Sequence, residues 1–113
     1  MSKDDYFVIV YQILSYLYVQ LKKGADIEPK MIEYDGPLFS INKKYWKYII
    51  INMKQDSLIT GINIDHIDNY GEHITNLECC QITPKGIAYL SENSFIQRAK
   101  ELFKDIKDVT PFI

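Results

Sequence analysis

The feature that most constrains this chain is an amphipathic helical segment, residues 43–56, that runs directly into a segment of β-strand character. Apolar residues recur along the helical segment at i, i+3, i+4 and i+7, which predicts one buried helix face. These residues are Trp46, Ile49, Ile50 and Met53. Asn42 precedes the segment as a favourable N-cap, and Ile41 and Trp46 occupy the two positions of a hydrophobic staple. We therefore expect a capped, half-buried helix here.

A β-hairpin is predicted after this helix. Leu58–Ile64 is rich in β-branched residues that are in phase, as in a half-buried strand. Asp65–His73 is polar and contains Asn69 and Gly71, so it is interpreted as a long hairpin loop. Ile74–Ile82 returns as the second strand. On that strand, alternation places Glu78, Cys80 and Ile82 on one face and Leu77, Cys79 and Gln81 on the other.

Further helices are predicted on both sides of this unit. The first spans residues 3–23, with Ser2 as its cap and Asp5 at the reciprocal capping position. Its expected buried stripe consists of Phe7, Val10, Leu14, Leu17 and Leu21. A later helix starts at Thr83-Pro84, a cap followed by proline at the first helical position. A last helix is expected from Ser94, with a stripe of Phe95, Ala99, Leu102, Phe103 and Ile106.

The order of these elements favours one fold class. A helix that feeds directly into a two-stranded hairpin, with a helix after it, is typical of the α+β winged helix-turn-helix fold. We expect three to four helices and a two-stranded β-hairpin wing in a single domain over residues 1–113. Residues 25–41 stay open: Pro29 could begin a short helix that ends near Gly36, or residues 38–41 could form a short strand. The alternative is a generic α+β domain that packs the same elements differently.

Charge is distributed unevenly along the chain. The formal net charge is −2 over 113 residues, so no strongly basic balance argues for nucleic acid. Residues 42–56 nevertheless carry four lysines against one aspartate, whereas residues 57–84 carry four acidic residues and no lysine or arginine. The predicted helix is therefore basic and the predicted hairpin acidic.

The sequence favours a cytoplasmic protein. Its N-terminus lacks the basic start and small-residue cleavage site of a signal peptide. Polar residues interrupt the apolar stretch Tyr6–Leu21, so no membrane span is expected. The only two cysteines, Cys79 and Cys80, are adjacent and provide no disulfide framework.

Three segments of the chain resemble the YjcQ family. They are Asp4–Tyr11, Ile41–Trp46 with Leu58–Gly61, and Gln81–Leu90. The resemblance implies a small winged-helix protein of a kind often encoded in prophages of Gram-positive bacteria, with no established biochemical activity. In the third segment, the pattern Thr83-x-x-Gly86-x-x-x-Leu90 is similar to the exit from the wing in many winged-helix regulators.

The leading functional hypothesis is binding of double-stranded DNA by the helix over residues 43–56. Lysines can hold phosphates, and asparagine or glutamine can read adenine edges in the major groove. The phosphate-binding candidates are Lys43, Lys47 and Lys54, and the candidate base readers are Lys44, Asn52 and Gln55. The simpler interpretation is a solvated helix face. DNA-binding relatives usually carry arginine or lysine in the hairpin loop, whereas this chain has Asp65, Asp68 and Glu72 there.

Two other classes of function compete with DNA binding. In the first, Tyr48 and Ile51 form an exposed patch for a protein partner, and the first and last helices supply a homodimer interface. In the second, the histidines and cysteines of the hairpin, His66, His73, Cys79 and Cys80, bind zinc or provide a nucleophile. Adjacent strand residues point to opposite faces and no standard spacing is present. We therefore expect no metal site, cofactor, small-molecule substrate or enzymatic activity.

Overall fold

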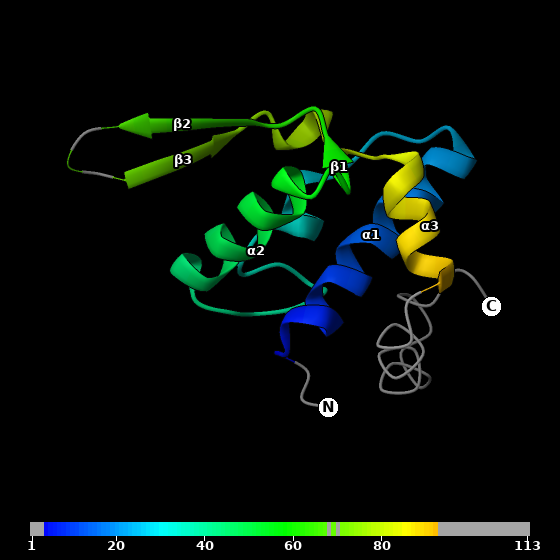
Figure 1. Ribbon diagram of the computed structural model, residues 1–113, viewed down its shortest axis with the longest axis horizontal. Coiled ribbons are helices and arrows are strands. Elements are labelled where there is room, and N and C mark those ends of the chain that lie inside the picture. The colour runs from blue at the N-terminus through cyan, green and yellow to red at the C-terminus, as the bar shows by residue number, and fades with distance from the viewer. Residues whose placement is uncertain (1–3, 68, 70, 93–113) are drawn as a thin grey trace.

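A computed structural model of the chain describes residues 4–67, 69 and 71–92 (Figure 1). In this part of the chain, three α-helices surround a core from which a β-hairpin projects beyond the end of one helix (Figure 1). This is the α+β, winged-helix-like layout that the sequence predicts. The expected last helix, with its stripe from Phe95 to Ile106, lies outside the described residues.

Helix α1 (Tyr6–Lys23) lies at the centre of this core. Every residue from Val8 to Ser15 is buried, because α2, α3 and β4 all contact the helix. The expectation of one buried stripe is therefore wrong, and Leu21, which was placed in that stripe, is 48% exposed. The expected start near residue 3 is also wrong, and Ser2, the expected cap, lies outside the described residues. The helix begins at Tyr6 with Asp5 in the N-cap position, and the Tyr45 hydroxyl donates a 2.8 Å hydrogen bond to the Asp4 carbonyl just before it.

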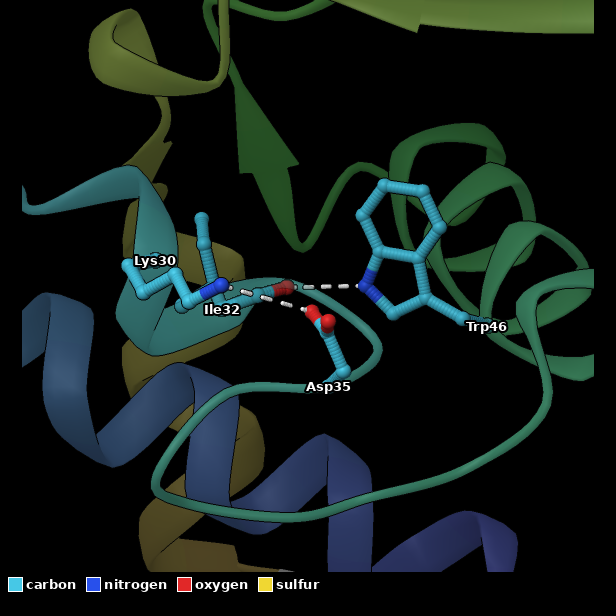
Figure 2. A network of polar contacts seen from close by, with 4 residues as sticks. All are labelled: Lys30, Ile32, Asp35 and Trp46. Carbon is cyan, nitrogen blue, oxygen red and sulfur yellow. Dashed lines mark hydrogen bonds and ion pairs between the residues drawn. The ribbon is translucent and has the colours of Figure 1, made fainter.

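The segment between α1 and α2 contains little regular secondary structure, and a hydrogen bond fixes it to α2. Its helical part is a single 3₁₀ turn, η1 (Pro29–Ile32), which ends before Gly36, and residues 38–41 form no strand. The Trp46 indole Nε1 donates a buried 2.8 Å hydrogen bond to the Ile32 carbonyl, as Figure 2 shows. In the same view, Lys30 and Asp35 form an exposed ion pair at 3.8 Å. The buried tryptophan thus anchors this segment to α2.

Helix α2 (Lys43–Gln55) forms as expected. The Asn42 Oδ1 accepts hydrogen bonds from the backbone N–H groups of Lys44 and Tyr45, at 2.8 and 3.1 Å. These bonds satisfy two of the donors that every helix N-terminus leaves unpaired. The expected inner face, Trp46, Ile49, Ile50 and Met53, is buried. The remaining faces of α2 are thereby left for solvent or for a ligand.

Two short antiparallel sheets replace the single hairpin that alternation predicts. Strand β1 (Ile59–Thr60) pairs with β4 (Gln81–Ile82) against the core. Strands β2 (Asn63–Ile67) and β3 (Gly71–Thr75) form the projecting hairpin. The long loop expected over residues 65–73 is therefore wrong, because most of those residues are paired.

The break between the two sheets has a local backbone cause. Gly61 has a φ of +94°, and a Cβ atom there would lie 2.0 Å from the Cys79 carbonyl oxygen. On the other side of the break, Asn76 has a φ of +62° and precedes a 3₁₀ turn, η2 (Leu77–Cys79). This turn disrupts the two-residue alternation, so the predicted common face of Glu78, Cys80 and Ile82 is wrong. Cys80 and Ile82 are buried, but Glu78 is exposed.

Helix α3 (Pro84–Glu92) starts as the sequence predicts. The Thr83 hydroxyl accepts a 3.0 Å hydrogen bond from the Gly86 N–H and donates to the Ser57 carbonyl. A Cβ atom on Gly86 would lie 2.4 Å from the Leu58 carbonyl oxygen, so glycine is needed for this close packing. The Thr-x-x-Gly pattern therefore joins α3 to the base of the hairpin.

Candidate nucleic-acid interface

A groove lies between the outer face of α2 and strand β3. It has a volume of about 580 Å³. Its lining consists of Lys44, Lys47, Tyr48, Ile51, Asn52 and Gln55 from α2 and of Gly71 and Glu72 from β3. The helix supplies one wall and the projecting hairpin the other. The inner face of α2 packs in the core, so the groove is built on the opposite side of the same helix.

Four of the six DNA-contact candidates line this groove: Lys44, Lys47, Asn52 and Gln55. Tyr48 and Ile51, the candidates for protein contact, line it as well. The two hypotheses drawn from the sequence thus converge on one surface. Within the described residues, neither Lys44 nor Lys47 takes part in an ion pair. Their charges are therefore available to an incoming anion.

Two predicted phosphate contacts, Lys43 and Lys54, lie elsewhere. The Lys43 ammonium lies 5.7 Å from the centroid of the Tyr34 ring, where a cation–π contact can form. The Lys54 ammonium donates a 2.9 Å hydrogen bond to the Ile62 carbonyl at the base of the hairpin. Lys54 is half-buried there and does not line the groove. We therefore leave Lys54 out of the candidate interface.

Lys54 also lies close enough to Cys80 to affect that thiol. Burial raises the pKa of Cys80 to about 12, and the positive charge of Lys54 offsets part of this rise. The thiol therefore stays protonated at neutral pH, which does not favour a nucleophile. Its neighbour Cys79 is exposed.

Other side chains of the groove have local contacts that define their positions. The Asn52 Nδ2 donates a 2.7 Å hydrogen bond to the Tyr48 carbonyl, one helical turn earlier. The Tyr48 ring is 61% exposed, and its centroid lies 6.1 Å from that of Tyr6 in an edge-to-face arrangement. Reading a base edge with Asn52 would require its amide to leave the helix backbone. Tyr48, in contrast, already presents its ring to solvent.

The groove is electrostatically divided. Its helix wall carries Lys44 and Lys47 and no acidic residue, whereas its hairpin wall carries Glu72. The sequence indicated that the hairpin is acidic. It did not indicate that Glu72 would face the two lysines, because the register of β2 and β3 and the direction of the hairpin depend on the backbone break near Gly61.

In the described part of the hairpin, the two histidines do not converge as metal ligands would. Residues 66 and 73 are not opposite one another in the register, since His66 pairs with Glu72 and His73 with Asp65. No group of three histidine, cysteine, aspartate or glutamate side chains suited to a metal occurs in the described part of the chain. Among these same residues, no helix combines the length and apolar character needed to cross a membrane.

The elements and the groove together define a winged-helix-like α+β protein with a basic helix beside an acidic hairpin. The family model described as YjcQ protein matches residues 11–109. The chain therefore belongs to the YjcQ family, as the three sequence segments indicated. None of the curated proteins and none of the solved structures compared with it gives a significant match.

Proposed function

We propose that this protein binds double-stranded DNA, with the outer face of α2 in the major groove. The observation that carries the proposal is the placement of Lys44, Lys47, Asn52 and Gln55 along one groove-lining face of a rigidly packed helix. The major groove of B-DNA is wide enough to admit an α-helix. In this arrangement Lys47 holds a phosphate, and so does Lys44, which the sequence suggested as a base reader. Gln55 approaches a base edge, and Asn52 does so once its amide leaves the Tyr48 carbonyl. The proposed setting is a regulatory role in the cytoplasm, and the link to a prophage is what the family resemblance implies.

The proposal is tested by fluorescence anisotropy on pooled duplex fragments from the neighbourhood of the gene, at low and at physiological salt. We expect salt-dependent binding that is tight for a subset of fragments, because phosphate contacts release counterions. The variant Lys44→Glu/Lys47→Glu should bind at least tenfold more weakly, and its salt dependence should decrease by about one unit of slope per lost phosphate contact. Unchanged binding by this double variant contradicts the proposed interface.

A matched control separates the interface from net charge. Lys23→Glu/Lys85→Glu changes the net charge by the same amount at two exposed positions on α1 and α3, away from the groove. At physiological salt this control should retain the affinity of the unaltered protein to within about twofold, since exposed charges beyond a Debye length are largely screened there. Circular dichroism checks that both variants fold. An equal loss in both variants would indicate non-specific attraction only.

A second candidate function is recognition of a protein partner on the same surface. It is favoured by the 61% exposure of Tyr48 and by Ile51 beside it, since aromatic and aliphatic side chains are typical of interface centres. A photo-crosslinking amino acid at position 48 would capture such a partner in cells. The captured protein, once purified, should bind the unaltered chain and lose affinity for Tyr48→Ala/Ile51→Ala. Retained affinity would reject this site.

A further inference from the structure

The two histidines of the chain each lie directly opposite a carboxylate across the β2–β3 hairpin. His66 pairs with Glu72, and Asp65 pairs with His73. Residues that are directly opposite in an antiparallel pair share a face, and successive residues along a strand alternate between faces. The two histidine–carboxylate pairs therefore lie on opposite faces of the hairpin.

One of these faces is the groove wall. Glu72 lines the groove, and its partner His66 shares its face. The pair Ile64–Ile74 lies two residues further along the same face, and both isoleucines are half-buried against the core. This face is thus turned toward the body of the protein and α2. The Asp65–His73 pair lies on the other face.

The charge of this hairpin wall affects the affinity of the groove for a phosphate. Lys44 and Lys47 attract a phosphate from the α2 side, and Glu72 repels it from the hairpin side. A neutral imidazole at position 66 leaves the carboxylate charge uncompensated, whereas an imidazolium offsets it. Among the described residues that line the groove, the one further titratable group is the Tyr48 phenol. Histidine is the side chain that ordinarily changes charge between pH 5 and 8.

We propose that the His66–Glu72 pair makes DNA binding at this groove depend on pH, with stronger binding when His66 is protonated. The proposal rests on the proposed DNA-binding function and assigns a regulatory role to the hairpin wall. Glu72 keeps the affinity for phosphate low near neutral pH, and protonation of His66 removes this opposition. His73, on the far face, has no comparable effect.

The test measures affinity for one duplex selected in the binding assay, at constant ionic strength between pH 8.0 and 5.5. The unaltered protein should bind about threefold more tightly at the lower pH, the effect of one exposed charge–charge interaction. His66→Gln should lose most of this gain, and the matched control His73→Gln should keep it. Glu72→Gln should bind about threefold more tightly than the unaltered protein already at pH 8.0.

The outcomes separate the two proposals. If the protein binds the duplex but its affinity does not change with pH, or if His66→Gln keeps the full pH dependence, the role of the His66–Glu72 pair is wrong and DNA binding stands. If His73→Gln removes the dependence instead, the assignment of the groove face is wrong. If the unaltered protein binds no duplex at any pH or salt concentration, the proposed function fails and the regulatory role fails with it.

Discussion

Helix α1 and the β2–β3 hairpin are the two extremes of this molecule. Eight consecutive residues of α1, Val8–Ser15, are buried, including polar Gln12, whose amide donates to the Leu38 carbonyl at 2.8 Å. In the hairpin only Ile64 and Ile74 are half-buried, and the other described residues are exposed. The two regions are therefore under different constraints on their amino-acid sequence. The sequence of α1 must satisfy packing on all sides, whereas most hairpin positions are free to carry charge for an encounter with a ligand.

The strongest test of this comparison is the same substitution in both regions. Ile13 has no exposed surface, and Ile13→Ala should lower the free energy of unfolding by about 2–5 kcal/mol, from lost burial and the cavity left behind. Ile67 is 42% exposed, and Ile67→Ala should change the same quantity by less than about 0.5 kcal/mol. Chemical denaturation measures both. A large loss at Ile67 would show that the hairpin belongs to the cooperative core.

A smaller effect tests whether the segment between α1 and α2 belongs with the buried region. Trp46→Phe removes the indole N–H that the Ile32 carbonyl accepts, and it leaves that buried oxygen without this partner (Figure 2). The free energy of unfolding should fall by about 1–3 kcal/mol, the usual cost of an unsatisfied buried group. Hydrogen exchange should show faster exchange at residues 29–35, with little change in the β2–β3 hairpin. Uniformly faster exchange would argue against a separate anchoring role.

The two adjacent cysteines differ in burial in the same way as the two regions, since Cys80 is buried and Cys79 is exposed. They provide the third test. Because burial raises the pKa of Cys80 to about 12 from an ordinary value near 9, the folded protein keeps a proton that the unfolded chain loses. Stability should therefore fall as the pH rises above about 9, by at most about 1.4 kcal/mol per pH unit from this thiol. Cys80→Ala should remove this part of the loss.

Cys79→Ala is the matched control for that measurement. Cys79 is exposed, so its replacement should leave the alkaline slope unchanged. Urea denaturation between pH 9 and 10 compares the three proteins, and the difference between their slopes isolates the contribution of each thiol. Equal slopes in all three would contradict the buried position of Cys80.

The sequence predicted the elements whose signals are local. The Asn42 cap and the spacing of Trp46, Ile49 and Ile50 specify α2 within a few residues, and both features occur in the structure. The Thr83 cap and Gly86 likewise specify the start of α3. Most of the groove could also be anticipated, because the outer face of α2 follows from its inner face at 100° per residue.

The remaining features depend on contacts between distant segments. The burial of α1 on several sides has no periodic signal, since a nearly continuous apolar run matches any stripe. The break in the hairpin arises where Gly61 meets the Cys79 carbonyl, which no alternation pattern reveals. The sequence favours Lys54 as a phosphate contact, and nothing in it reveals the Ile62 carbonyl as a partner, because this contact joins α2 to the base of the hairpin beside the break. The position of Glu72 opposite Lys44 and Lys47 has the same origin.

The break at Gly61 and Asn76 also makes the hairpin exchangeable. The β1–β4 pairing holds its own register, Ile59 with Ile82 and Thr60 with Gln81, independently of the register beyond the break. Hairpins of other lengths or charges can therefore be grafted between the two positions without shifting the strands that pack on the core. A set of such chimaeras, built on one constant body, would allow ligand preference to be re-engineered through the hairpin alone.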